Sequence, residues 1–86
     1  MKINFTNHAK RKFKILQEYG LSLTKKQVEE TARNPEIILE GKHNRFIAQK
    51  TLDNGHLLRV IFEKENKETR IITFYPARRD RYESKL

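Results

Sequence analysis

The sequence predicts an α+β fold in which an N-terminal two-helix hairpin packs on a twisted, mainly antiparallel sheet of three to five strands. Apolar residues recur at helical spacing before Pro35, and after it they alternate as in strands, with turn signals between the runs. Only 36% of the 86 residues are apolar, so the core is small and residues 1–86 are expected to form one domain.

The first elements are expected to be a short strand at residues 2–5 and a helix at residues 7–19. The strand is followed by Thr6 or Asn7, either of which is a suitable N-cap. Gly20 suits the position just past the last helical turn. The helix is predicted by an apolar stripe at helical spacing: Ala9, Phe13, Leu16 and Tyr19.

A second helix is expected at residues 25–33. Thr24 and Gln27 have the spacing of a capping box, and the residue before Pro35 disfavours helical backbone. Because only residues 20–23 separate the two helices, they are expected to pair as a helical hairpin.

The remaining residues predict strands at 37–41, 46–52, 57–63 and 70–75. The last two are apolar on both faces, which is typical of central strands. Alternation groups Ile71 with Thr73 and Tyr75 on one face, and Pro76 is expected to end the strand pairing. One sheet face should carry the helices, and Arg59, Thr73 and Tyr75 are expected on the other, partly open face.

The charge favours an anionic partner. The chain has 19 Lys and Arg against 11 Asp and Glu, a formal net charge of +8. The alternative is that basic faces only keep a small protein soluble. Without cysteine there is no disulfide or thiolate zinc site, and no apolar run is long enough to span a bilayer. A cytoplasmic protein that binds no membrane, metal or cofactor is expected.

Two basic residues stand out within the predicted elements. Arg59 interrupts an apolar strand, so it must either face an open surface or form an ion pair, for example with Glu63, Glu29 or Glu30. His8 begins the first helix among lysines and arginines. It is a candidate for proton transfer, and the alternative is a helix-end histidine bonded to the backbone.

The C-terminal segment combines arginines with tyrosines. Arginine binds phosphates bidentately, and tyrosine rings offer a stacking surface for bases, so this segment is a candidate RNA-binding region. The alternative is a solvated basic tail. The residues concerned are Tyr75, Arg78, Arg79, Arg81 and Tyr82.

Several short motifs together resemble a known family. They are Phe5-Thr6-x-His8-Ala9-x-Arg11, Gly20-Leu21-Ser22, Asn34-Pro35 and Arg70-Ile71-Ile72-Thr73-Phe74-Tyr75-Pro76-x-Arg78-Arg79. With these motifs the chain resembles a family of small uncharacterised domains related to the RelE/ParE/BrnT superfamily of bacterial and archaeal toxins, over nearly its whole length.

The resemblance implies a RelE-like toxin of a type II toxin–antitoxin system, neutralised by a cognate antitoxin that is acidic or partly disordered. Many relatives are endoribonucleases that cleave mRNA, often on the ribosome, whereas ParE-like relatives inhibit gyrase. By position, His8, Arg59, Tyr75 and Arg79 are the candidate catalytic residues. The candidate RNA-binding residues are Arg11, Arg78, Arg81 and Tyr82.

The implied reaction is cleavage by the ribose 2′-OH without a metal ion, with arginines stabilising the charge on phosphorus. The alternatives are a non-catalytic basic binding module, which includes a gyrase-inhibiting toxin or a nucleic-acid-binding protein, and a housekeeping domain without toxicity.

Overall fold

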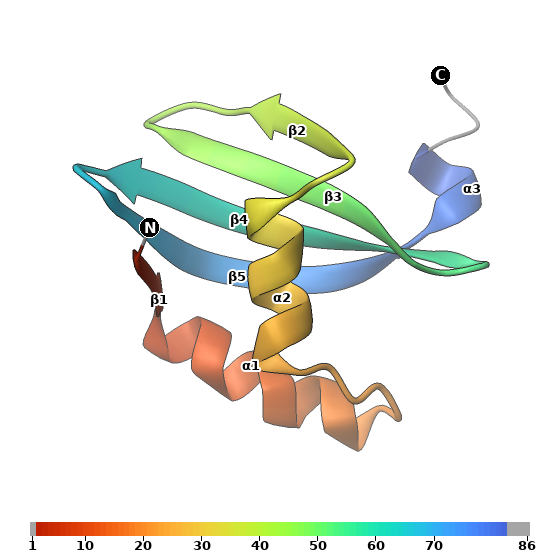
Figure 1. Cartoon of the computed structure of the whole chain (residues 1–86). Coiled ribbons are helices and arrows are strands. Elements are labelled where there is room, and N and C mark those ends of the chain that lie inside the picture. Colours follow the sequence, from red (N-terminus) through yellow and green to blue (C-terminus); the bar gives the residue numbers. More distant parts are fainter. Residues whose placement is uncertain (1, 83–86) are drawn as a thin grey trace.

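Five strands form one mixed sheet, and the fold is α+β (Figure 1). The computed structural model describes residues 2–82, without the side chains of Arg81 and Tyr82. The strand order is β1-β5-β4-β3-β2, with β1 parallel to β5 and all other neighbours antiparallel. The strands are β1 (Lys2–Phe5), β2 (Ile37–Glu40), β3 (Arg45–Asp53), β4 (His56–Glu65) and β5 (Glu68–Arg78). The helices are α1 (Asn7–Glu18), α2 (Lys25–Arg33) and α3 (Arg79–Tyr82).

The predicted helix starts are confirmed at the level of single hydrogen bonds. The Thr6 hydroxyl accepts from the backbone N–H of Ala9, so Thr6 is the N-cap of α1. The capping box of α2 is complete, since Thr24 and Gln27 each bond the other's backbone. One residue of the predicted stripe was placed wrongly: Tyr19 lies just past the helix and is 85% exposed.

Thr6 also attaches the start of α1 to the sheet. Its backbone N–H donates to the carbonyl of Ile71 (3.0 Å), and its hydroxyl donates to the carbonyl of Ile72 (2.9 Å). Thr6 therefore both caps α1 and fixes the start of this helix against β5.

A β-bulge at Ile72 changes the alternation along β5. Phe62 on β4 lies opposite Ile71, but the preceding Ile61 lies opposite Thr73, so Ile72 is an extra residue. Ile71 and Phe74 consequently both enter the core on the helix side, and Thr73 faces the opposite side. The predicted grouping was wrong for Ile71, because simple alternation does not include the extra residue, whereas Thr73 and Tyr75 do share the face opposite the helices, as expected.

Both long helices cover one face of the sheet (Figure 1). The main contacts of α1 are with β5, and those of α2 are with β4 and β3. Figure 1 shows the two helices running in different directions. The structure therefore does not confirm a helical hairpin that packs as one unit.

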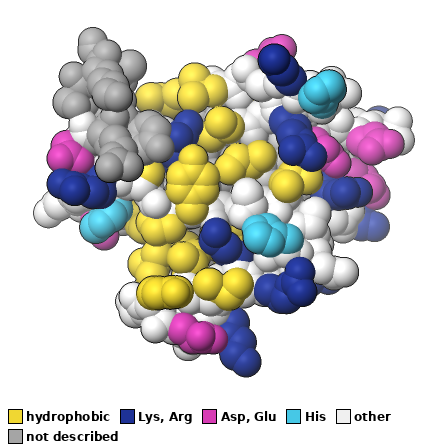
Figure 2. Space-filling view, turned by 180° about the vertical axis from the view of Figure 1, so that it is seen from behind, with side chains coloured by type: hydrophobic (Ala, Val, Ile, Leu, Met, Phe, Trp, Pro, Cys, Tyr) yellow, Lys and Arg dark blue, Asp and Glu magenta, His cyan; other side chains and the backbone are white. Residues whose placement is uncertain are grey.

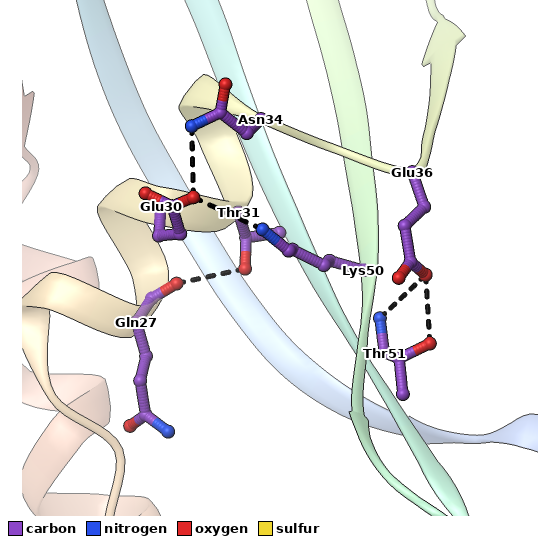
Figure 3. Close-up of polar contacts among 7 residues, drawn as sticks. All are labelled: Gln27, Glu30, Thr31, Asn34, Glu36, Lys50 and Thr51. Carbon is purple, nitrogen blue, oxygen red and sulfur yellow. Dashed lines mark hydrogen bonds and ion pairs between the residues drawn. The ribbon is translucent and has the colours of Figure 1, made fainter.

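Polar contacts fix α2 to the neighbouring strand. Lys50 of β3 reaches across to Glu30 (3.3 Å), which also accepts from Asn34 at the end of the helix (3.0 Å) (Figure 3). Beneath them, the buried Thr31 hydroxyl donates to the Gln27 carbonyl (2.9 Å). Two buried apolar residues of α2, Val28 and Ala32, then join the core.

The C-terminal end of the sheet differs from the prediction. Pro76 does not end the pairing: it lies opposite Leu58, and β5 continues to Arg78. This is possible because β1 pairs only with residues 68–71, so Pro76 lies on an edge where no strand needs its missing N–H. The short helix α3, which was not predicted, follows directly. No helix within residues 2–82 is long and apolar enough to cross a membrane.

Replacing Thr6 by valine should destabilise the fold by about 1–3 kcal/mol, because the cap of α1 and the bond to the bulge are lost together. Urea unfolding measures the effect. Thr6→Ser keeps the hydroxyl and should lose less than about 1 kcal/mol. Equal stability of the two variants would show that the hydroxyl does not hold the helix to β5.

Candidate functional site

The sheet face opposite α1 and α2 is the candidate site, and we call it the open face. Figure 2 views the molecule from this side and shows hydrophobic side chains over its middle, with basic and histidine side chains around them. By strand register its residues are Ile37 and Leu39 of β2, Arg45, Ile47, Gln49 and Thr51 of β3, Leu57, Arg59, Ile61 and Glu63 of β4, and Arg70, Thr73, Tyr75 and Ala77 of β5.

Arg59 and Tyr75 form the centre of the open face. They are direct cross-strand partners, and Arg59 Nη1 donates to the Tyr75 hydroxyl at 3.1 Å. The guanidinium carbon also lies 5.8 Å from the centre of the tyrosine ring. Arg59 is only 8% exposed, and Tyr75 is partly buried beside it.

The carboxylates suggested as partners of Arg59 pair elsewhere. Glu63 lies between Arg45 (3.7 Å) and Arg70 (3.5 Å), Glu30 binds Lys50, and Glu29 binds Arg33. The sequence did identify the face of Arg59 correctly, because β4 contains no bulge and alternates regularly between Leu57 and Phe62.

His8 reaches the open face from the start of α1. Its Nε2 lies 3.1 Å from the hydroxyl of Thr73, which is two residues before Tyr75 on β5. The suggested bond from His8 to a backbone group was therefore wrong. Thr73 and Tyr75 lie on the same face about 7 Å apart, so His8, Thr73, Tyr75 and Arg59 form a continuous row.

Arg79 follows the last residue of β5, and its side chain reaches Thr51 of β3. Its Nη2 donates to the Thr51 hydroxyl at 2.6 Å, and its backbone N–H donates to the Gly55 carbonyl at 2.9 Å. Thr51 shares its face with Gln49, which is opposite Arg59 on β4. Thr51 and Arg59 are therefore diagonal neighbours on adjacent strands, and such neighbours are about 7–8 Å apart. The guanidinium groups of Arg59 and Arg79 belong to the same face.

The predicted RNA-binding residues do not all join this face. Arg11 is exposed on α1, one turn after His8. Arg78 is exposed, binds Asp80 at 3.2 Å, and alternates with Ala77 so that it shares the side of its partner His56. The side chains of Arg81 and Tyr82 lie outside the described residues.

Sequence reasoning missed the polar residues that hold the basic ones. Thr73 contacts His8, and Thr51 and Glu36 lie behind Arg79. The face of Thr51 follows from alternation with Gln49 within the predicted strand 46–52, but its bond to Arg79 has no local signal. Thr73 does lie on the open face with Arg59 and Tyr75, as expected, but its contact with His8 joins residues 65 positions apart and has no local signal.

The surroundings of Glu36 keep it ionised. The hydroxyl and the backbone N–H of Thr51 both donate to its carboxylate, and these bonds, with the charges of Arg79 and Lys50, lower the pKa of Glu36. This carboxylate belongs to the same polar group as Arg79, so the open face contains a fixed negative charge next to a basic one.

The donors present suit phosphate recognition. The row His8–Tyr75–Arg59 and the neighbouring Arg79 offer an imidazole, a phenol and two guanidinium groups on one face, which can bind an anion and transfer protons. Within residues 2–82, no group of three or more His, Asp and Glu side chains could hold a metal ion. Comparisons with protein-family models, curated proteins and solved structures found no match to this chain.

Replacing Tyr75 by phenylalanine should destabilise the fold by about 1 kcal/mol, because Arg59 loses a hydrogen-bond acceptor in a nearly buried position. Urea unfolding measures the loss, and Tyr19→Phe is the matched control, since Tyr19 is 85% exposed. Identical midpoints for the two variants would mean that the Arg59–Tyr75 bond adds nothing to stability.

Glu36 should stabilise the fold only when it is ionised. Its pKa is lower in the folded chain than the ordinary value of 4.5, so its contribution is complete above that pH and is lost as the pH falls through the lower, folded pKa. The stability difference between the unsubstituted chain and Glu36→Gln, measured by urea unfolding, should therefore shrink as the pH falls below 4.5. A difference that stays constant would show that the charge of Glu36 is not involved.

Proposed function

We propose that the chain is a RelE-like toxin of a type II toxin–antitoxin system, a metal-independent endoribonuclease that binds and cleaves mRNA on the open face. The observation that supports this best is the convergence of His8, Tyr75, Arg59 and Arg79 on that face, although they come from α1, β5, β4 and the start of α3. The side chains of these four residues have the chemistry for phosphate binding and proton transfer.

In the proposed reaction the ribose 2′-oxygen forms a bond to the adjacent phosphorus and the bond from phosphorus to the 5′-oxygen breaks. The 2′-hydroxyl gives its proton to a base, and the leaving 5′-oxygen receives one. We assign this proton transfer to His8, because an imidazole nitrogen can accept the proton of the 2′-hydroxyl.

Tyr75 and the arginines act on the phosphate. Because the Tyr75 oxygen accepts a hydrogen bond from Arg59, its own hydrogen can be donated to a phosphate oxygen. The hydrogen bond from Arg59 makes the Tyr75 hydroxyl a stronger donor, and Arg79 adds a second positive charge on the same face. Charge stabilisation of this kind is worth about 2–4 kcal/mol for each donor in the transition state.

The open face also fits a protein that blocks it. Leu39 is 46% exposed. Figure 2 shows hydrophobic side chains over the middle of this side of the molecule. A patch of this kind marks an interaction surface. We propose that an acidic or partly disordered antitoxin covers it in the cytoplasm, where mRNA and the ribosome would be the targets.

A second candidate function is non-catalytic binding, in which the face binds nucleic acid or inhibits gyrase without cleaving a bond. It is favoured by the structural contacts of the arginines: Arg59 is nearly buried against Tyr75, and Arg79 is bonded to Thr51. Arginines held in this way can bind phosphate even where no group transfers a proton.

Purified protein should cleave single-stranded RNA in buffer containing EDTA, and His8→Asn should slow cleavage about 100-fold to 10,000-fold. Lys14→Ala is the control: it removes a positive charge from the exposed side of α1 and should leave the rate within about twofold. DNA of the same sequence should remain intact, because it lacks the attacking 2′-hydroxyl.

Binding without cleavage would support the second candidate instead. In that case affinity should fall steeply with salt, and Arg79→Ala should reduce the slope of log K against log salt by about 1. Cleavage that is unchanged in His8→Asn, Tyr75→Phe and Arg79→Ala alike would show that the open face is not the active site.

A further inference from the structure

Arg79 is held on the open face by a chain of hydrogen bonds that begins at Glu36. The Thr51 hydroxyl carries a single hydrogen, and it is donated to Glu36 Oε1 at 2.9 Å (Figure 3). The same carboxylate oxygen accepts the backbone N–H of Thr51, also at 2.9 Å. With its hydrogen committed to Glu36, the hydroxyl can only accept from Arg79.

The bond from Arg79 to Thr51 is short, at 2.6 Å between Nη2 and Oγ1. A charged donor and an acceptor whose own hydrogen is bound to a carboxylate polarise each other, which strengthens both bonds. The backbone of Arg79 is fixed as well, because its N–H is bonded to Gly55. Hydrogen bonds therefore hold both the backbone of Arg79, through Gly55, and the end of its side chain, through Thr51.

We propose that Glu36 and Thr51 are positioning residues, which hold the guanidinium group of Arg79 in the orientation that the RNA phosphate requires on the open face. This inference rests on the proposed ribonuclease function. Neither residue needs to touch RNA: each acts through Arg79. Without these bonds an arginine at the end of a strand would sample several rotamers, and only some of them would direct the guanidinium group at the reacting phosphate.

Because Glu36 is negatively charged, orientation of Arg79 and electrostatic attraction of RNA predict different effects when Glu36 is replaced. A carboxylate near the site lowers the positive potential, so removing it should not weaken binding of an anionic ligand. Loss of the orientation of Arg79 should slow the chemical step instead. A residue that served only the stability of the fold would not produce this combination.

The test measures single-turnover cleavage of an RNA oligonucleotide and its Kd separately. Thr51→Val and Glu36→Gln should each lower the cleavage rate about tenfold or more, while Kd stays within about twofold or becomes tighter. Thr51→Ser keeps the hydroxyl and should restore the rate. Glu40→Gln is the matched control, because it removes the same charge from exposed β2 without touching Thr51. Urea unfolding of each variant fixes conditions in which all of them are folded.

Double substitution gives the decisive comparison. In an Arg79→Ala background, Thr51→Val and Glu36→Gln should cause no further loss of rate, because the residue that they orient is gone. Losses that multiply with that of Arg79→Ala, or an equal loss in Glu40→Gln, would overturn the positioning role while leaving the ribonuclease intact. Absence of cleavage by the unsubstituted chain would instead contradict the proposed function, and the inference with it.

Discussion

The extra residue at Ile72 is the constraint on which the rest of the structure depends. The bulge allows two residues of β5 that regular alternation would place on opposite faces, Ile71 and Phe74, to enter the same core. It also places Tyr75 on the open face opposite Arg59. Thr6 holds the bulged carbonyl and caps α1, so the position of His8 depends on the same irregularity.

The open face combines two demands that conflict in most domains. Its middle is apolar, yet a nearly buried arginine lies within it, and burying a charge is costly unless it is bonded. The Tyr75 hydroxyl and ring partly meet that need by a hydrogen bond and a cation–π contact. The same hydrogen bond polarises the Tyr75 hydroxyl.

The chain has a net charge of +8, and its charged residues make different contacts on the two faces of the sheet. On the helix side, Lys50 contributes to stability by joining β3 to α2. On the open face, Glu63 and Glu36 each serve arginines, the first between Arg45 and Arg70 and the second through Thr51. The acidic residues of that face therefore orient basic groups as well as lowering the total charge.

Local signals in the sequence were enough to determine the α+β class, the two long helices with their caps, all five strand segments and the face of Arg59, because capping, turn residues and alternation act over a few residues. Tertiary structure alone decided four features. They are the convergence of His8, Tyr75 and Arg79, the directions of the helices, the parallel pairing of β1 and the continuation of β5 past Pro76. Each depends on contacts between residues far apart in the chain: Thr6 with Ile72, His8 with Thr73, and Arg79 with Thr51. The bulge has no local signature in Arg70–Tyr75, and with it Phe74 packs against Phe13 of α1, a residue 61 positions away, at 4.6 Å between ring centroids.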